Sequence, residues 1–217
     1  DVVIGVSQSG ETADTLEALE IAKAEGARIA SIVNMVGSTT TRMSDFPYFT
    51  RSGPEICVAS TKAFTAQVAW GLVLAHAAAG KYEAGVSAIN TTSEKLNKYF
   101  TEDLFRRIQN LAKQLTKHDH CFVLGKGAHY NIALEGALKV KEITYKHFEG
   151  FAAGELKHGV IALIEKGTPV FVIISNDKYK DDMLTATSEV KSRGAWTIGI
   201  AKEKSTLFDD HIPCIDA

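Results

Sequence analysis

The sequence contains an internal repeat, and this repeat limits the folds that are open to the chain. An apolar run that ends in a serine, a helical pattern, a glycine and a second apolar run occur twice in the same order. Ser7 and Gly26 mark the first copy, and Ser175 and Gly194 mark the second at a constant offset of 168 residues. A constant offset across several elements indicates two copies of one α/β unit. Because strands and helices alternate, we predict parallel sheets.

The apolar periodicity places the individual elements within this scheme. We expect strands at residues 2–6, 28–34, 46–50, 120–124, 168–175 and 196–201, helices at 11–25, 63–79, 129–145 and 179–192, a short helix ending at 43, two helical patterns within 81–117, and a loop at 148–158. The first strand should be covered on both faces, as in a typical parallel sheet. The helix at 63–79 is almost wholly apolar and should therefore be buried.

These elements predict an α/β fold of two tandem units, each a parallel sheet sandwiched between helices in a flavodoxin-like three-layer arrangement. We place the units at residues 1–80 and 108–217, with a helical connector at 81–107. The second copy has strands and helices ahead of its repeat that the first copy lacks. The second copy in turn ends before any counterpart of Ser60-Thr61-Lys62. We therefore expect both units to be incomplete and the chain to be an internal fragment of a longer protein.

Composition excludes some classes of partner. The formal net charge of −2 offers no general attraction to nucleic acid or to a membrane surface. No apolar run approaches the roughly 18 residues that a membrane-spanning helix needs. Cys57, Cys121 and Cys214 are scattered and form no CxxC pair, as expected for reduced thiols in a cytoplasmic protein without a metal site.

Hydroxyl side chains gather where the first predicted strand meets the first predicted helix. Ser7, Ser9, Gly10 and Thr12 lie in this turn, and a helix start offers unpaired N–H groups and a positive dipole end. The turn therefore suits a phosphate on a neutral sugar, although a plain helix cap with spare serines explains the spacing equally well. The second copy has Asp177 near this position, which would repel a phosphate, so we expect one phosphate site per chain.

A charged stripe lies on the helix predicted at 129–145. Glu135, Lys139 and Glu142 are four and three residues apart and should share one face. The stripe is either a solvated set of ion pairs or a carboxylate base held in a cleft, with the lysine setting its charge.

One histidine has a setting that is typical of function. His158 lies in a glycine-flanked loop, a common place for functional side chains. The other histidines are interpreted as structural or surface residues: His76, His118, His120, His129, His147 and His211. No spacing of histidines and acidic residues resembles a zinc site.

Four segments together resemble one enzyme family. The segments SQSGETADTL, PEICVASTKAFTAQ, ALEGALKVKEITY and AAGELKHG occur in that family's order. They resemble the isomerase half of the glutamine–fructose-6-phosphate aminotransferases, or glucosamine-6-phosphate synthases, which contains two sugar isomerase (SIS) units. The resemblance covers essentially the whole chain.

The resemblance implies a substrate site. It implies that the turn at residues 7–12 binds the phosphate of fructose 6-phosphate. It also implies that the segment at residues 58–60 contacts the sugar. The implied substrate-binding residues are Ser7, Gln8, Ser9, Gly10, Thr12, Val58 and Ser60. It implies glucosamine 6-phosphate as the product and no metal or organic cofactor.

The resemblance also implies catalytic roles. Glu142 matches the base that moves a proton between C1 and C2 after ammonia has added to the ketone, and Lys139 and Glu135 match its charged neighbours. His158 matches a histidine implicated in ring opening, which the family supplies from the neighbouring subunit. A homodimer is therefore implied.

The sequence also departs from the family. The glutaminase domain, the start of the first SIS unit and the C-terminal tail with its imine-forming lysine are absent, and Gly159-Val160 replaces the usual Gly-Pro. We expect the chain alone not to catalyse the complete reaction. Two alternatives are another SIS isomerase or deglycase acting on phosphosugars, and a non-catalytic sugar-phosphate sensor. The sensor would not need the acid, lysine and histidine motifs.

Overall fold

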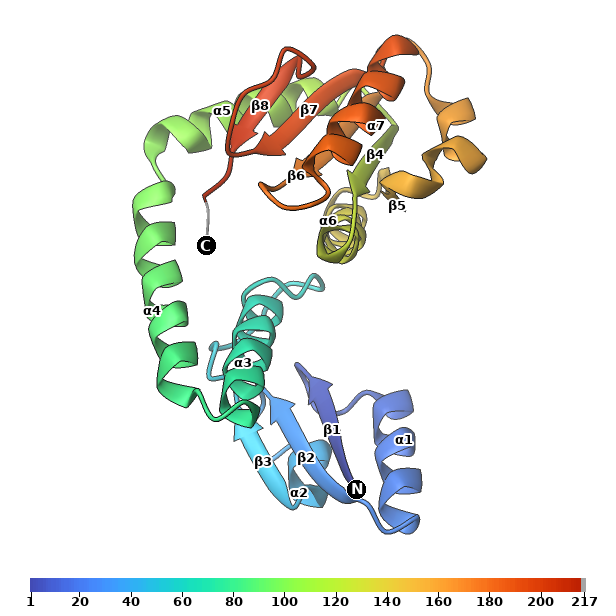
Figure 1. Ribbon diagram of the computed structural model, residues 1–217. Coiled ribbons are helices and arrows are strands. Elements are labelled where there is room, and N and C mark those ends of the chain that lie inside the picture. The colour runs from blue at the N-terminus through green and yellow to red at the C-terminus, as the bar shows by residue number, and fades with distance from the viewer. Residues whose placement is uncertain (216–217) are drawn as a thin grey trace. The chain divides into compact units, whose positions relative to one another are not determined.

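The computed structural model describes residues 1–215 and contains two compact units, unit 1 (Asp1–Thr91) and unit 2 (Thr92–Ala217) (Figure 1). The division between them falls within helix α4 (Tyr82–Tyr99).

Unit 1 is built on a parallel sheet with the strand order β1-β2-β3. Its elements are β1 (Val2–Ser7), α1 (Ala13–Ala24), β2 (Arg28–Val33), α2 (Thr39–Met43), β3 (Phe46–Phe49), α3 (Lys62–Ala78) and the first part of α4. Helix α1 packs on β1 through Leu19, whose side chain lies against Gly5, where a Cβ would come within 2.7 Å of it. Glycine at this position therefore allows the close approach of helix and strand.

Unit 2 contains a larger parallel sheet, with the order β5-β4-β6-β7-β8 among the described residues. Its elements are α5 (Glu102–Leu115), β4 (His120–Gly125), α6 (Ala128–Thr144), β5 (His147–Ala152), the 3₁₀ helices η1 (Ala153–His158) and η2 (Val160–Leu163), β6 (Pro169–Ile174), α7 (Lys180–Ser192), β7 (Trp196–Ala201) and β8 (Asp210–Pro213).

Alternate side chains of β4 enter two different cores, which places helices on both faces of this sheet. Cys121 and Val123 pack with Ala133 and Ala137 of α6. On the other face, Phe122 and Leu124 belong to a core that includes Met183, Ala186 and Val190 of α7. This alternation follows from the two-residue period of a strand. The predicted class, α/β with parallel sheets between helices, is confirmed for the described residues.

The internal repeat is visible in the topology. The order and parallel direction of β1, β2 and β3 reappear in β6, β7 and β8, with α7 in the place of α1. The copies differ after their second strand. Residues 34–45 include α2 in the first copy, whereas the shorter segment 202–209 contains no helix in the second.

Strand β1 corrects one prediction, because it is not covered on both faces. Val2, Ile4 and Val6 are 58%, 43% and 49% exposed, while Gly5 and Ser7 on the other face are buried. In the described chain β1 is at the edge of its sheet, and α1 covers only the face that Gly5 presents.

The prediction that the apolar helix at 63–79 is buried is also wrong for this structure. Of α3, only Ala63 is fully buried, and Val68, Leu72 and Leu74 are at least one-third exposed. The helix is covered along one flank only. There Trp70 lies 4.9 Å from the Tyr48 ring, measured between ring centroids. The apolar composition of α3 indicates that the helix packs against other elements. It does not show how much of the helix surface those elements cover.

Two strands were not predicted. Residues 147–152, mostly assigned to a loop, form β5, which pairs with β4 along its full length. Gly150 interrupts its apolar pattern and lies against α6, where a Cβ would come within 2.8 Å of the Ala133 backbone. The other strand, β8, is a short edge strand that contains Pro213, a residue that weakens the strand pattern in a sequence.

Candidate functional site

The turn between β1 and α1 is organised by its own serines. Ser7 is buried, and its Oγ accepts a hydrogen bond of 2.9 Å from the Gly10 N–H. The Ser9 Oγ accepts one of 3.2 Å from the Glu11 N–H. Gly10 has a φ of +69°, and a Cβ there would lie 2.2 Å from the Ser38 Oγ. Only glycine fits this position, both in conformation and in space.

A second polar segment supports this turn, and sequence reasoning missed it. Thr40 donates two hydrogen bonds to the Gly10 carbonyl, from N at 3.0 Å and from Oγ1 at 2.8 Å. The Thr39 N–H donates to the Glu11 carboxylate at 2.7 Å, and this bond lowers the pKa of that carboxyl. The available signal was the polar run 38–41, which follows the neighbouring parallel strand, so both segments lie at the same edge of the sheet.

Thr12 precedes α1 but does not cap it with its side chain. Its side chain is exposed, and the helix begins at Ala13. The first N–H groups of a helix have no acceptor within the helix, and here the preceding hydroxyl does not take one. These donors and the helix dipole favour an anion, although the carboxylate of Asp14 in the first turn offsets part of the positive potential.

The equivalent turn in the second copy is already occupied by a carboxylate. Asp177 Oδ1 accepts a hydrogen bond of 2.8 Å from the Tyr179 N–H, just before α7. This bond is the main reason that the pKa of the Asp177 carboxyl is lowered. The Tyr179 N–H, which could otherwise donate to a bound anion, is therefore already bound to the negative side chain of Asp177.

The segment that contains Val58 and Ser60 is anchored at both ends. Near its start, the Asn34 side chain donates to the Gly53 carbonyl at 2.7 Å and accepts from the Ser52 N–H at 3.0 Å. Near its end, Glu55 accepts a 3.0 Å hydrogen bond from the Ala63 N–H in the first turn of α3.

Between these anchors the side chains differ in exposure. Val58 is 86% exposed, Ser60 is half-buried and Ala59 is buried. Asn34 and Glu55 are structural residues of this segment that sequence reasoning missed.

The charged stripe on α6 forms a connected set of ion pairs. Lys139 Nζ lies 2.9 Å from Glu142 Oε2 and 3.4 Å from Glu135 Oε1. The hydrogen bond to Glu142 raises the pKa of Lys139, against the opposing effect of burial, and Glu135 raises it further. All three side chains are 20–25% exposed.

Four of the larger apolar side chains of α6 are more exposed than these charges. Ile132, Leu134, Leu138 and Ile143 are 40–55% exposed. A solvated surface stripe would show the opposite distribution. The charged set is thus more withdrawn from water than these four apolar side chains.

His158 is the last residue of η1 and is exposed. Leu156, two residues earlier, is fully buried in the core of unit 2 and fixes η1 to the sheet. Lys157 pairs with Glu189 of α7 at 2.8 Å. Among residues 1–215, no hydrogen bond or ion pair links His158 to the charged set on α6.

The predicted site residues therefore fall into two groups. Ser7, Gln8, Ser9, Gly10, Thr12, Val58 and Ser60 lie in unit 1, and Glu135, Lys139, Glu142 and His158 lie in unit 2. Direct contacts join the three charged residues of α6, and hydrogen bonds join the residues of the β1–α1 turn.

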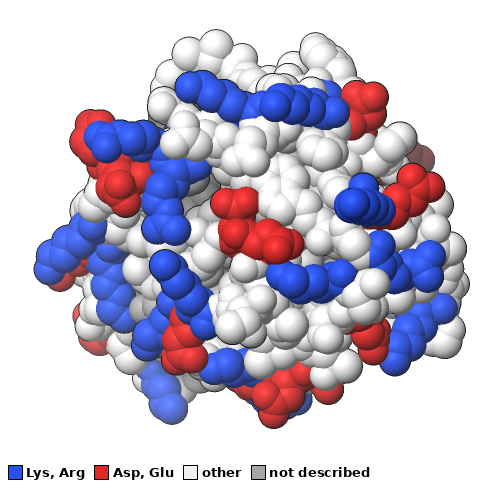
Figure 2. All heavy atoms as spheres, turned by 90° about the horizontal axis from the view of Figure 1, so that it is seen from above, with Lys and Arg blue, Asp and Glu red and all other residues white. Residues whose placement is uncertain are grey.

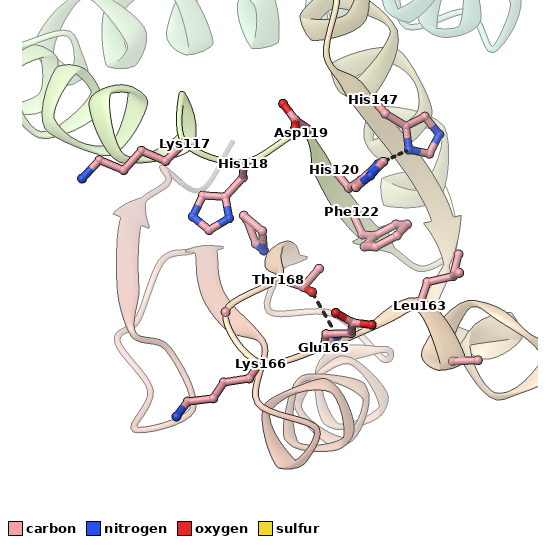
Figure 3. Close-up of a pocket in the computed structure, with 13 residues that line it drawn as sticks. Lys117, His118, Asp119, His120, Phe122, His147, Leu163, Glu165, Lys166 and Thr168 are labelled. Atoms are coloured by element: carbon pink, nitrogen blue, oxygen red, sulfur yellow. Dashed lines mark hydrogen bonds between the residues drawn. The ribbon is translucent and has the colours of Figure 1, made fainter.

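The described part of the chain was found to offer neither a metal cluster nor a membrane span. No group of three or more His, Cys, Asp or Glu side chains there could hold a metal ion, and no helix there is long and apolar enough to cross a membrane. Figure 2 shows Lys and Arg interspersed with Asp and Glu on the face drawn, without a broad patch of one sign. A cavity of about 640 Å³ in unit 2 (Figure 3) is lined by none of the predicted site residues.

Comparison with protein families and known proteins gives a consistent result. The SIS domain model matches residues 1–77 and 114–211. The glutamine–fructose-6-phosphate aminotransferase [isomerizing] of Corynebacterium efficiens is 44% identical over 97% of this chain and 35% of its own length. That of Fusobacterium nucleatum is 43% identical over 100% of this chain and 37% of its own length.

A solved structure is similar over the same range. The C-terminal domain of glucosamine-fructose-6-phosphate aminotransferase from Francisella tularensis superimposes with a TM-score of 0.83 at 34% identity, covering 98% of this chain and 63% of that one. The chain thus spans about one-third of the length of the curated relatives that it matches.

Proposed function

Because the chain belongs to the SIS domain family, we propose that it is the isomerase part of a glutamine–fructose-6-phosphate aminotransferase. In this proposal it binds fructose 6-phosphate and, with ammonia released from glutamine, takes part in forming glucosamine 6-phosphate. The observation that carries the proposal is the similarity along almost the whole chain to proteins named for that reaction.

The phosphate of the sugar binds at the β1–α1 turn. The first N–H groups of α1, which the Thr12 side chain does not cap, and the exposed Thr12 hydroxyl support this assignment. Ser7, Ser9 and Gly10 hold the turn in shape through their own hydrogen bonds and close packing. Gln8 completes the turn, and Val58 and Ser60 contact the sugar.

Glu142 moves the proton during isomerisation. Once ammonia has added at the ketone carbon of the substrate, the Glu142 carboxylate removes a proton from C1 and returns it to C2. A base needs a defined position, and the 2.9 Å contact with Lys139 supports the position of this carboxylate. Glu135 holds Lys139 from the other side, and His158 assists opening of the sugar ring.

The remaining parts of the proposal concern the whole protein. A glutaminase domain elsewhere in the full protein supplies the ammonia, no metal or organic cofactor is used, and the protein acts in the cytoplasm as a homodimer in which His158 serves the neighbouring subunit. The exposed apolar side chains of α6 support such an assembly, because subunit interfaces bury surfaces of this kind. The domain boundaries at residues 80 and 108 are part of the same proposal.

Calorimetry with three ligands tests the binding step. Fructose 6-phosphate, fructose and inorganic phosphate would each be titrated into the full chain. We expect fructose to bind at least about tenfold more weakly than fructose 6-phosphate, because hydrogen bonds to a charged group contribute about 1.5–3 kcal/mol. Equal affinities for the two sugars would reject the assignment of the turn as a phosphate site.

A further inference from the structure

Two histidines lie next to each other at the start of neighbouring strands in unit 2. His120 is the first residue of β4, His147 is the first residue of β5, and the parallel pairing makes them direct partners. They are 27 residues apart in the sequence. Both line the cavity of about 640 Å³ described above, and a dashed line joins the two imidazoles in Figure 3.

The distance between the two rings is that of a pair of metal ligands. Their Nδ1 atoms are 3.3 Å apart. Two imidazole nitrogens bound to one tetrahedral zinc ion at about 2.0–2.1 Å are themselves about 3.3–3.4 Å apart. We propose that His120 and His147 form a binding site for a late first-row divalent metal ion such as Zn²⁺ or Cu²⁺.

A neighbouring carboxylate favours the protonation pattern that such a site needs. Both Nδ1 atoms must be free of protons, so each neutral ring must carry its proton on Nε2. Glu149 Oε2 lies 3.4 Å from His147 Nε2 and favours that tautomer in His147. Carboxylates in this position orient many metal-bound histidines. Without a metal, the hydrogen bond between the two rings needs a proton on one of the two Nδ1 atoms, so metal binding requires that proton to move to Nε2 of the same ring.

The rest of the coordination shell is water. Because residues 1–215 hold no group of three ligating side chains, the protein supplies two ligands and the adjoining cavity supplies room for solvent. The nearby Asp119 carboxylate is paired with Lys146 at 3.2 Å. In Figure 3 the side chains of Lys117 and Lys166 extend away from the histidine pair.

The choice of metal ion follows from the ligands, because neutral imidazoles favour copper, nickel and zinc over magnesium or calcium.

A metal ion bound here would join the edge strand β5 to β4. The ion binds only when the two strands are paired, so it stabilises the folded state. The proposed sugar-phosphate chemistry uses neither histidine, so the two proposals can fail separately.

Electron paramagnetic resonance with Cu²⁺ tests the site directly. One equivalent of Cu²⁺ would be added to the full chain, and electron spin-echo modulation would count the bound imidazoles. We expect two in the wild type and at most one in His120→Asn or His147→Asn. The matched control is His118→Gln, which changes another histidine of the same cavity, whose ring lies 5.7 Å from that of Trp196. It should leave two imidazoles bound.

Zn²⁺ calorimetry provides the second measurement. Removing either histidine should weaken binding by about 10²-fold, because two linked ligands bind one ion far more tightly than one alone. Glu149→Gln should weaken it by about tenfold without changing the stoichiometry. One bound imidazole in the wild type, or unchanged Zn²⁺ affinity in both His120→Asn and His147→Asn, would overturn the proposal.

Discussion

Lys139 Nζ and Glu142 Oε2 are 2.9 Å apart on α6, and both side chains are mostly shielded from solvent. This pair matters because four larger apolar side chains of the same helix, those of Ile132, Leu134, Leu138 and Ile143, are more exposed than the two charges. An ordinary surface ion pair contributes little to stability. A pair withdrawn from water while apolar side chains stay exposed is better explained by a role in binding or chemistry.

Gly10 and Gly37 provide a matched test of the β1–α1 turn. Both have positive φ, +69° and +77°, but a Cβ would clash with Ser38 at Gly10 and meets nothing within 4 Å at Gly37. Gly37→Ala should therefore lower the free energy of unfolding by about 1–2 kcal/mol, from backbone strain alone. Gly10→Ala should lower the free energy of unfolding by about 1–3 kcal/mol more than Gly37→Ala does, because the Ser38 side chain must also move to make room for the Cβ. Urea denaturation measures both, and equal losses would contradict the described packing of Gly10.

Thr12 and Ser7 should separate ligand binding from stability. Thr12→Val should weaken binding of fructose 6-phosphate by about 1–3 kcal/mol, because the hydroxyl that it removes does not cap α1 and is free for the phosphate. It should leave the free energy of unfolding almost unchanged. Ser7→Ala removes the acceptor of the Gly10 N–H and should lower the free energy of unfolding by about 1 kcal/mol. Calorimetry and urea denaturation check the two variants, and unchanged sugar-phosphate affinity in Thr12→Val would remove Thr12 from the site.

The cysteines should differ in reactivity. Cys57 is exposed, beside the 86% exposed Val58. Cys121 is buried, and burial raises the pKa of its thiol, which keeps it protonated and unreactive. Ellman's reagent should label Cys57 rapidly in the native protein and Cys121 only after denaturation.

Fructose 6-phosphate should also slow labelling of Cys57, because its neighbour Val58 is a proposed sugar contact. Cys57→Ser should remove the fast phase and identify it. Rapid native labelling of Cys121 would show that β4 is more open than described.

Asp209 should give part of the stability a pH dependence. Burial alone raises the pKa of its carboxyl, but hydrogen bonds from Lys191 and Thr197 outweigh burial, and the pKa is lowered overall. A lowered folded pKa gives stability that is present above the unfolded value of about 3.9 and is lost as the pH falls through the folded value. At pH 7 the free energy of unfolding of the wild type should exceed that of Asp209→Asn by about 1 kcal/mol. This difference is modest because the Asp209 side chain is 42% exposed. Urea denaturation from pH 7 to 3 should show this difference shrinking only below about pH 4; a constant difference would contradict the role given to the charge.

Local patterns predicted much of this fold. The repeat placed β1, β2, β6 and β7 because apolar runs of strand length recur there at one offset. The wrong predictions concern the packing partners of an element, which its own sequence does not show. The apolar composition of α3 could not show which of its faces find a partner, and the glycine in β5 hid a strand that the neighbouring β4 stabilises.

The candidate site shows the same limit. Helical spacing was enough to predict that Glu135, Lys139 and Glu142 share a face, because the three residues are close in sequence. The support of Gly10 by Thr40 spans 30 residues and depends on two strands ending side by side. The pairing of His120 with His147 depends on β5, a strand that the sequence pattern does not predict.

Exchange of the C1 hydrogen of the substrate with deuterated water tests the central claim, that Glu142 is the proton-transferring base. The measurement uses the full-length protein with fructose 6-phosphate and ammonia, followed by NMR, and the control is Glu94→Gln, which alters an exposed carboxylate on α4. We predict that Glu142→Gln binds fructose 6-phosphate as the wild type does but slows exchange by at least about 10²-fold, while the control exchanges normally. Exchange at the wild-type rate in Glu142→Gln would contradict the claim and make the Glu135, Lys139 and Glu142 set a structural ion-pair network.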